Sequence, residues 1–291
     1  MDLAEAFDRE GFSGVLLVDG VVPSGTLILA FMRYEAEREV LREGAWIHPY
    51  YRASQAAYEA SRRIIAVAAR SSLVIEDRPD ILVKPVFARL PELQQGRNTL
   101  SYLRDAGSRF HVQVLAAEGT LPGAIRLQNQ PKPLRCGDCR LCMDACPTGA
   151  IDEAGFHRER CLRNWQASGQ VMPESVRGRM GNRLLGCDAC QRCCPMNPEP
   201  AGDPCGTVPL RDLLQDTKAC ALRLRSVIGA NYAIPNRLLA QACILAGCSG
   251  DSAWASILRG LCGHPSRQVG EHAAWALRSL EGRDEAGMSA E

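Results

Sequence analysis

Apolar residues follow two different patterns within the first 128 residues of the chain. Three short apolar runs are typical of buried strands: Val15–Val18, Thr26–Met32 and Val112–Ala117. In contrast, Ala53–Ala69 has apolar residues spaced by three and four, and Ser54 stands before most of them as a helix cap. The combination predicts an α/β domain over residues 1–128.

A helical pattern dominates the last third of the chain. From Leu210 onward, leucine, alanine and isoleucine recur at intervals of three and four, which predicts a small helical domain. The closing stretch SAWASILRGLCGHPSRQVGEHAAWALRSL predicts two helices joined by a Gly-His-Pro turn and resembles one HEAT-type unit. Because a single unit cannot form a solenoid, we expect this segment to pack on the rest of the chain.

Two stretches rich in proline and glycine separate these regions from the middle of the chain. The first is NQPKPLR, residues 129–135, and the second is NPEPAGDPCG, which begins at Asn197. We therefore predict an α+β multidomain protein. Its parts are an α/β domain over 1–128, a bacterial ferredoxin-like domain with two 4Fe-4S clusters over 129–200, and a helical, HEAT-like domain over 201–291.

Composition narrows the class of protein. The 291 residues carry a net charge of +1 and average apolar content, as in ordinary globular proteins. The start MDLAEAFDREGF lacks the pattern of a secretory signal, and the longest apolar run is far shorter than the ~20 residues that cross a membrane. We expect a cytoplasmic protein, where 14 cysteines favour metal or redox sites over disulfides.

Nine of these cysteines lie in two blocks and at one position between them. The first block, CGDCRLCMDACPTGA, spells C-x2-C-x2-C-x3-C-P, and the second is GCDACQRCCPMNP. In bacterial ferredoxins the first three thiolates of such a run hold one 4Fe-4S cluster, and the fourth reaches a different cluster. The spacing therefore predicts two clusters. Paired C-x2-C motifs also build zinc sites, but nine thiols without a matched histidine pair favour iron–sulfur.

The crossing of ligands assigns two sets of cysteines. The first set consists of Cys136, Cys139, Cys142 and Cys194. The second set consists of Cys146, Cys187, Cys190 and a fourth thiol, which the spacing leaves open between Cys161 and Cys193. The remaining cysteines show no ligand spacing and are predicted to be apolar core residues: Cys205, Cys220, Cys243, Cys248 and Cys262.

With both blocks in view, the chain resembles the epoxyqueuosine reductase family and, more distantly, the reductive dehalogenases. The resemblance is carried by CGDCRLCMDACPTGAI, by RCLRNW around Cys161, and by GNRLLGCDACQRCCPMNP. It extends to QGRNTLSYLRDAGSRF, residues 95–110, and to the closing helical segment HPSRQVGEHAAWALRSL. Together these stretches reach over roughly the last two thirds of the chain.

The resemblance implies a function. In this family, electrons pass through two 4Fe-4S clusters to a base-off cobalamin held by the α/β domain, and the substrate is epoxyqueuosine in tRNA. It further implies that Cys161 completes the second set, that Asn98 and Ser108 lie near the cobalamin, and that the electron donor is a flavodoxin or a ferredoxin.

The N-terminal part departs from the family pattern, because the stretch that carries the proposed catalytic acid is not recognisable. The chain has FMRYEAEREVLREGAWIHPYYRAS instead, so no residue is assigned as catalytic. Glu35 is interpreted as a helix-surface residue, and His48, Tyr50 and Tyr51 as packing residues. This departure motivates a second hypothesis, an electron-transfer partner protein without substrate chemistry of its own.

A third hypothesis is an RNA-binding protein with structural clusters. Arg177, Arg179 and Arg183 form a local group that could contact phosphates. We interpret the group instead as a solvated surface that also balances the negative charge of the clusters.

Overall fold

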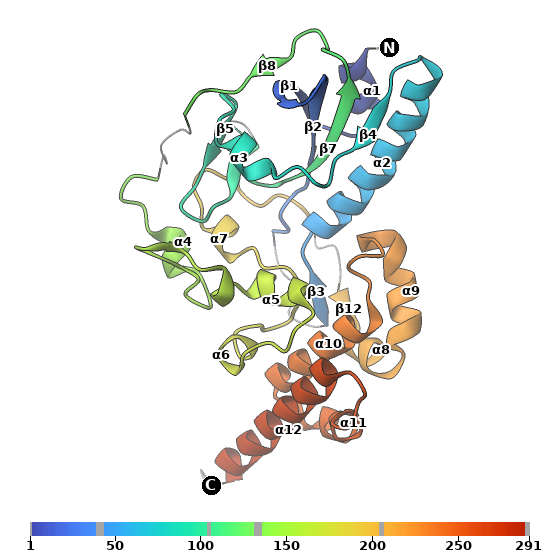
Figure 1. Cartoon of the computed structure of the whole chain (residues 1–291). Coiled ribbons are helices and arrows are strands. Elements are labelled where there is room, and N and C mark those ends of the chain that lie inside the picture. Colours follow the sequence, from blue (N-terminus) through green and yellow to red (C-terminus); the bar gives the residue numbers. More distant parts are fainter. Residues whose placement is uncertain (1, 39–43, 104–105, 131–135, 204–206, 289–291) are drawn as a thin grey trace. The chain divides into compact units, whose positions relative to one another are not determined.

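The chain folds into two compact units, which are built from interleaved stretches of sequence. The computed structural model (Figure 1) describes residues 2–38, 44–103, 106–130, 136–203 and 207–288. Unit 1 consists of Met1–Ala36, Pro49–Cys142 and Cys190–Ala201, and unit 2 of Glu37–His48, Met143–Ala189 and Gly202–Glu291. The predicted cluster segment 129–200 thus contributes to both units. Within the described residues, no helix is long and apolar enough to cross a membrane.

Unit 1 is built around a five-stranded sheet with the strand order β4-β7-β2-β1-β8. All neighbours are antiparallel except β1 and β8. Its strands are β1 (Gly14–Val22), β2 (Gly25–Arg33), β4 (Ile75–Asp77), β7 (Phe110–Glu118) and β8 (Ile125–Arg126). The helices of unit 1 include α1 (Leu3–Arg9), α2 (Tyr50–Arg70) and α3 (Val83–Phe87), and a hairpin joins β5 (Leu93–Gln95) to β6 (Ser101–Leu103).

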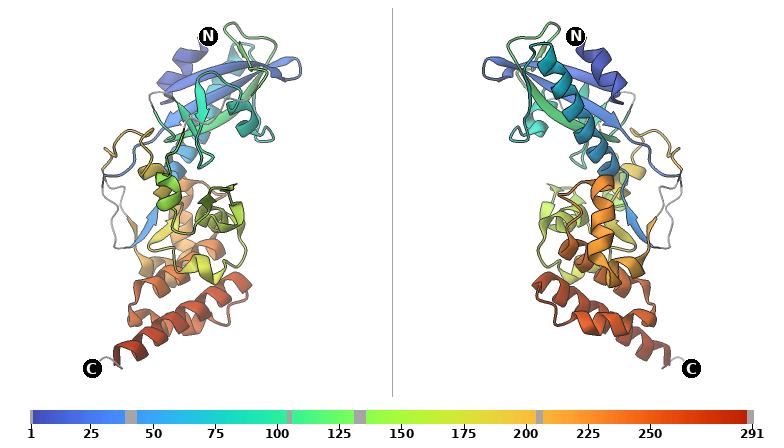
Figure 2. Two further views of the ribbon diagram at one scale, coloured as in Figure 1. Left: turned by 90° about the vertical axis from the view of Figure 1, so that its left-hand side faces the viewer. Right: turned by 90° about the vertical axis from the view of Figure 1, so that its right-hand side faces the viewer.

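Strand β2 shows why this sheet has two buried faces. Its side chains alternate across the sheet, so that Ile28, Ala30 and Met32 pack with α2 while Leu27, Leu29 and Phe31 pack on the opposite side. On the first side, Ala57, Ala60, Ile64 and Ala68 of α2 meet the sheet, and the helix covers that face in both views of Figure 2. The three predicted strands and the predicted helix are confirmed.

The start of α2 differs from the prediction. The helix begins at Tyr50, so Ser54 lies inside it and caps nothing. Pro49 precedes the helix with φ −53°, and its carbonyl accepts hydrogen bonds from the backbone N–H groups of Arg52 and Ala53. Proline fixes φ near the helical value, so the ring of Pro49 starts the helix without a side-chain cap. Glu35 lies in an exposed loop and not on a helix, contrary to the prediction.

Segment 190–201 of unit 1 is held by buried polar contacts. The Asn197 side-chain oxygen accepts hydrogen bonds from the Ser108 N–H at 2.6 Å and from the Ser108 hydroxyl at 3.1 Å. The Gln191 amide donates to the Ser108 carbonyl at 3.0 Å, and the Arg109 guanidinium donates to the Pro198 carbonyl at 2.7 Å. Ser108 and Arg109 are buried, so these bonds fix the segment to the beginning of β7.

Gly107 makes room for this segment. Its φ is +62°, and a Cβ atom there would lie 2.2 Å from the side-chain oxygen of Asn197 and 3.0 Å from the carbonyl oxygen of Met196. A side chain at position 107 would therefore be strained and would also displace the backbone of segment 190–201.

Unit 2 contains a small sheet with the order β11-β3-β12: β3 (Ala45–Ile47), β11 (Arg183–Leu185) and β12 (Thr207–Val208). Trp46 of β3 is buried, and its indole N–H donates to the carboxylate of Glu37 at 2.7 Å. A second, two-stranded sheet pairs β9 (Ile151–Asp152) with β10 (Gly155–Phe156). Residues 37–48 thus belong structurally with unit 2, although they precede α2 in the sequence.

Helices make up most of unit 2. They are η1 (Arg158–Arg160), α5 (Leu162–Ser168), α6 (Glu174–Arg177), α8 (Leu210–Gln215), α9 (Thr217–Ile228), α10 (Pro235–Ser249), η2 (Ser252–Trp254), α11 (Ala255–Leu261) and α12 (Arg267–Met288). Two short helices, α4 (Leu141–Asp144) and α7 (Ala189–Arg192), lie where the chain passes between the units. The predicted pair of helices around the Gly-His-Pro turn is confirmed as α11 and α12.

The cysteines predicted as core residues differ among themselves. Cys220 and Cys243 are buried, as predicted. Cys248 is half-buried, and its thiol contacts the Arg177 carbonyl at 3.4 Å. Cys262 is exposed at the end of α11, so its prediction as a core residue is wrong. Cys205 lies outside the described residues, as do residues 131–135 of the predicted first linker.

His272 joins α12 to two other parts of unit 2. The imidazole Nδ1 lies 3.0 Å from the Ala240 carbonyl oxygen, and Nε2 lies 2.9 Å from the backbone nitrogen of Met172. Nε2 must accept from that N–H, so Nδ1 carries the proton and donates to Ala240. Burial lowers the pKa of His272 to about 4, and the ring is neutral in the folded protein at neutral pH.

We predict that substituting Gly107→Ala destabilises the protein by about 2–3 kcal/mol in chemical denaturation, because strain and a backbone clash add together. Gly123→Ala is the matched control, since Gly123 has φ +79° but open space around its Cβ position. The control is expected to cost about 1 kcal/mol from backbone strain alone. Equal losses in the two variants would contradict the packing role of Gly107.

We also predict that His272 makes stability depend on pH. The unfolded chain takes up this proton below about pH 6.5 while the folded protein resists until about pH 4, so the stability contribution is complete above pH 6.5 and is lost as pH falls toward 4. The loss amounts to about 3 kcal/mol. In His272→Gln, whose amide can make both hydrogen bonds, the free energy of unfolding should decline less over this range. Parallel pH profiles for the two proteins would contradict this.

Candidate iron–sulfur site

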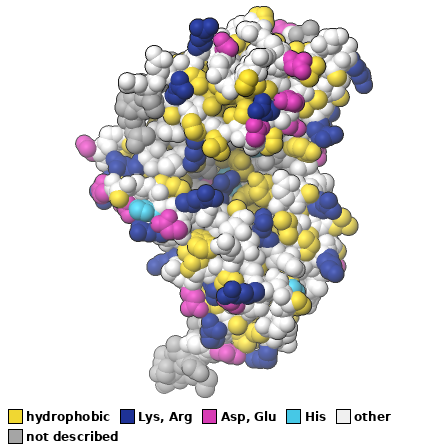
Figure 3. Space-filling model, viewed as in Figure 1, with side chains coloured by type: hydrophobic (Ala, Val, Ile, Leu, Met, Phe, Trp, Pro, Cys, Tyr) yellow, Lys and Arg dark blue, Asp and Glu magenta, His cyan; other side chains and the backbone are white. Residues whose placement is uncertain are grey.

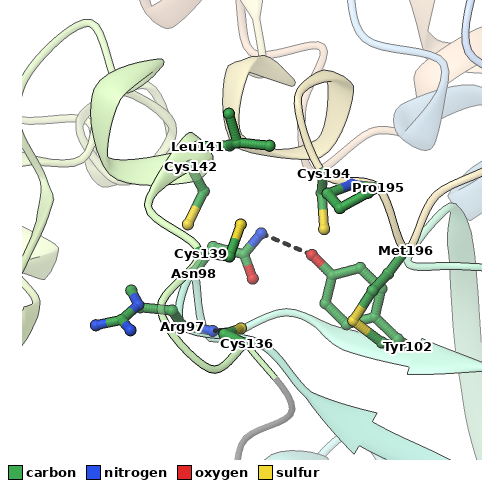
Figure 4. Close-up of a pocket in the computed structure, with 11 residues that line it drawn as sticks. Arg97, Asn98, Tyr102, Cys136, Cys139, Leu141, Cys142, Cys194, Pro195 and Met196 are labelled. Atoms are coloured by element: carbon green, nitrogen blue, oxygen red, sulfur yellow. Dashed lines mark hydrogen bonds between the residues drawn. The ribbon is translucent and has the colours of Figure 1, made fainter.

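A cavity in unit 1 brings the first set of cysteines together. Residues of three separate stretches line a partly open cavity, and the thiols of Cys136, Cys139, Cys142 and Cys194 surround it (Figure 4). The remaining lining residues are Gly96, Arg97, Asn98, Tyr102, Leu141, Pro195 and Met196. Cys194 comes from the second block, yet it lines the same space as three thiols of the first.

This geometry differs from a site for one metal ion. Among the residues that the structure describes, no three His, Cys, Asp or Glu side chains form a group that could hold a single ion. A 4Fe-4S cluster has four irons, and each takes one thiolate from the protein, so its ligands surround a space and do not meet at one point. Four thiols around one cavity fit that requirement.

Each Cys-Pro pair forms a tight turn. The Gly149 N–H donates to the Cys146 carbonyl at 3.2 Å, and the Asn197 N–H donates to the Cys194 carbonyl at 3.0 Å. Proline is therefore the second residue of both turns, where its fixed φ is favoured. The turn reverses the chain directly after the cysteine. The same turn occurs in both blocks, which explains why proline follows the last cysteine of each block.

The tip of the β5–β6 hairpin forms one wall of the cavity. The backbone N–H of Arg97 donates to the sulfur of Cys136 at 3.2 Å, and the Arg97 guanidinium donates to the Gly137 carbonyl at 3.0 Å. Thr99 at this tip has φ +60°, an uncommon conformation for a β-branched residue. The strained turn thus presents both a donor and a cation next to the first block.

Asn98 and Tyr102 connect this hairpin to Cys194. The Asn98 amide donates to the Tyr102 hydroxyl at 2.7 Å and to the Cys190 carbonyl at 3.1 Å. The Tyr102 hydroxyl also lies near the Cys194 sulfur and the Ser108 hydroxyl, and both influence its pKa. Burial raises the pKa of Tyr102 above its ordinary value. The phenol therefore keeps its proton at neutral pH.

Cys193 lies beside the first set but does not line its cavity. Burial raises the pKa of Cys193 to about 11, and the neighbouring thiols of Cys142 and Cys194 add to the rise. Burial likewise raises the pKa of Cys142. Since metal ligands must be thiolates, cluster assembly has to release the Cys142 proton.

Three thiols of the second set belong to unit 2. The sulfur of Cys146 accepts a hydrogen bond from the Ala150 N–H at 3.2 Å and lies 3.7 Å from the Thr148 hydroxyl. Cys161 lies between η1 and α5, close enough to Cys187 to raise the pKa of that thiol. Burial is the largest cause of that rise, and Arg183 opposes it. The fourth residue of the set, Cys190, lies in α7 at the start of a unit 1 segment.

The arginines of the predicted group have different surroundings. Arg177 is buried, its guanidinium donates to the Met172 carbonyl at 2.6 Å, and it lies 5.8 Å from the ring centre of Trp275. Its interpretation as part of a solvated surface is therefore wrong. Arg183 contributes positive charge near Cys187. On the face shown in Figure 3, basic side chains are scattered among acidic ones.

The residues considered for the missing acid differ in exposure. Glu35 is exposed, whereas His48 and Tyr51 are buried. Tyr50 begins α2, and its hydroxyl lies 3.3 Å from Nδ1 of His111.

Sequence reasoning missed Arg97, Tyr102, Gln191 and Asn197 as residues around the first set. Tyr102 lies between Asn98 and Ser108 in the segment that carries the resemblance. A polar aromatic residue there was the available signal, since a buried tyrosine hydroxyl needs a hydrogen-bond partner.

Comparison with known proteins agrees with this geometry. Residues 135–197 match the family model described as a 4Fe-4S double cluster binding domain. The epoxyqueuosine reductase of Aliivibrio fischeri is 36% identical over 126 residues, which cover 42% of this chain and 32% of that protein. The match thus spans about a third of the length of this curated relative.

Solved structures extend the likeness of the fold. The epoxyqueuosine reductase of Streptococcus thermophilus has a TM-score of 0.70 at 18% identity, covering 96% of this chain and 90% of that one. A crystal structure of epoxyqueuosine reductase with a tRNA-Tyr epoxyqueuosine-modified stem loop has a TM-score of 0.70 at 19% identity, covering 89% of this chain and 75% of that one. Residues 135–197 therefore match a 4Fe-4S double cluster binding domain, and the chain has the fold of the solved epoxyqueuosine reductases.

Proposed function

We propose that the chain is an iron–sulfur oxidoreductase that passes electrons through two 4Fe-4S clusters. The first set, Cys136, Cys139, Cys142 and Cys194, holds one cluster. The second set, completed by Cys161, holds the other. The observation that carries this proposal is the position of Cys194, which lines one cavity with three thiols of the first block. The proximity of Cys161 to Cys187 supports the choice of Cys161, and Cys193 lies near the first set instead.

The protein's own groups prepare both sites for electron transfer. When bound, the clusters supply one-electron redox chemistry. The Arg97 and Ala150 N–H groups donate to the sulfurs of Cys136 and Cys146, and hydrogen bonds to cluster sulfurs stabilise their negative charge. The cation of Arg183 acts in the same direction at Cys187.

The proposed substrate is epoxyqueuosine in tRNA, and the proposed final cofactor is cobalamin held by residues 1–128. The electron donor in this proposal is a flavodoxin or a ferredoxin. Support comes from the relatives' names and from the tRNA stem loop in one of their structures. Residues 129–200 supply the clusters and residues 201–291 a helical support.

The hydrogen bonds of Asn98 and Ser108 show whether these side chains are available to contact cobalamin. Both amide hydrogens of Asn98 are used by Tyr102 and Cys190, and Ser108 is bonded to Asn197 and Gln191. These side chains do not fit a direct contact with a corrinoid. Their polar atoms serve the surroundings of the first set, and no reaction step is derived through cobalamin.

A second candidate function is electron transfer to a separate enzyme. It is favoured by the absence of a recognisable acid stretch in the N-terminal sequence. An RNA-binding protein with purely structural clusters is less favoured, because Arg177 is buried against Trp275.

We predict that anaerobically reconstituted protein binds about eight iron atoms per chain, in two 4Fe-4S clusters. Cys194→Ala should retain about half of this iron, because the first cluster loses a thiolate. Cys193→Ala is the matched control and should keep the full amount. Iron and sulfide analysis with electron paramagnetic resonance (EPR) spectroscopy measures both. Full iron in Cys194→Ala with loss in Cys193→Ala would contradict the assignment.

A second experiment separates the two candidate functions. Protein reconstituted with iron, sulfide and cobalamin is reduced and mixed with an epoxyqueuosine-modified tRNA stem loop, and cobalt content and conversion to queuosine are measured. The proposed reductase should retain cobalt and form queuosine. A protein that retains no cobalt and converts no stem loop, yet passes electrons to a second redox protein, would be the electron-transfer partner.

A further inference from the structure

A hydrogen bond from Asn98 orients the Tyr102 hydroxyl beside the sulfur of Cys194. Asn98 can only donate through its amide nitrogen, which lies 2.7 Å from the Tyr102 hydroxyl. The phenol oxygen therefore accepts from Asn98, and its single proton is left for another partner. Two possible acceptors lie near it, the Ser108 hydroxyl and the Cys194 sulfur, and the hydroxyl points toward the Cys194 sulfur in Figure 4. A cluster-bound thiolate is the negatively charged acceptor of the two, and a charged acceptor makes the stronger hydrogen bond.

The surroundings hold this geometry in place. Tyr102 is 2% exposed and Asn98 is 4% exposed, so both side chains are shielded from solvent. The second amide hydrogen of Asn98 is bound to the Cys190 carbonyl at 3.1 Å, and the side-chain oxygen of Asn98 accepts from the Leu100 N–H at 3.2 Å. All these groups belong to unit 1. Asn98 is thus a positioning residue that orients the phenol.

We propose that Tyr102 sets the reduction potential of the first cluster by donating a hydrogen bond to the sulfur of Cys194. The inference rests on the proposed function, because it requires a cluster bound by the first set. It assigns a role to a side chain outside the cysteine motifs.

The physical basis is charge stabilisation. Reduction adds one electron to a cluster that is already negative, and a donor on a ligand sulfur favours the more negative state. A hydrogen bond to a charged group in a buried site is stronger than one between neutral groups. Removing the phenol proton therefore makes the first cluster harder to reduce.

The effect should be confined to one cluster. In the second set, the described hydrogen-bond partners of the Cys146 sulfur are the Ala150 N–H at 3.2 Å and the more distant Thr148 hydroxyl at 3.7 Å. Neither partner belongs to the hairpin that carries Asn98 and Tyr102. A substitution at Tyr102 should therefore change the reduction potential of the first cluster only, whereas a general loosening of the protein would change the potentials of both clusters.

The test is the substitution Tyr102→Phe, which keeps the buried ring and removes only the hydroxyl. In an anaerobic redox titration followed by EPR, we expect one of the two clusters to reduce at a more negative potential. The expected change is about tenfold in the reduction equilibrium constant, which is about 59 mV for one electron. The second cluster and the iron content should stay unchanged.

Two matched controls accompany this variant. Tyr58→Phe removes an exposed hydroxyl of α2 and should leave both potentials unchanged. Thr148→Val removes the hydroxyl near Cys146 and should affect the other cluster if it affects either. In the unsubstituted protein, electron–nuclear double resonance of the reduced first cluster should show a strongly coupled exchangeable proton that Tyr102→Phe lacks.

The outcomes are distinct. Unchanged potentials in an iron-replete Tyr102→Phe protein, or equal shifts of both clusters, would overturn the inference. If the variant fails to bind iron, the proton resonance in the unsubstituted protein decides, and its absence there would also overturn it. Failure of the unsubstituted protein to bind clusters at all would instead refute the proposed function.

Discussion

The position of Cys194 is the constraint on which the rest of unit 1 depends. The chain leaves this unit after Cys142 and returns at Cys190, so one thiol of the first cavity must be delivered by a separate segment. Closing such a loop costs conformational entropy, which contacts of the returning segment must offset. The protein fixes the returning segment with its own hydrogen bonds and with the Cys-Pro turn.

These bonds explain why so many polar groups are buried near the cavity. Ser108, Gln191 and Asn98 are each less than a tenth exposed, and each has partners in the segments around the first set. Buried polar groups stabilise a structure only when they are satisfied. Here their satisfaction determines where Cys194 and Tyr102 lie, so the same network that orders the segment also supplies the donors next to the sulfurs.

The sequence predicted the features that depend on local spacing. Strand alternation in Thr26–Met32 and the helical period of Ala53–Ala69 follow from backbone geometry, and both were found. The C-x2-C-x2-C spacing of the first block and the Cys194-Pro195 pair of the second block identified four thiols that line one cavity. Features that depend on distant partners were not predictable in this way. Trp46 finds Glu37 and β11 only after the chain folds, and Arg177 is buried because Trp275 packs over it.

The resemblance around residues 95–110 has a structural explanation that does not need cobalamin. Asn98 fixes Tyr102 and Cys190, Gly107 admits Asn197, and Ser108 binds the same asparagine. Every one of these contacts serves the segment that delivers Cys194. A protein with this first cluster would need such residues whether it reduces a substrate itself or passes electrons onward. Residues 95–110 therefore support a cluster at the first set of cysteines. The choice between the two functions depends on the α/β part.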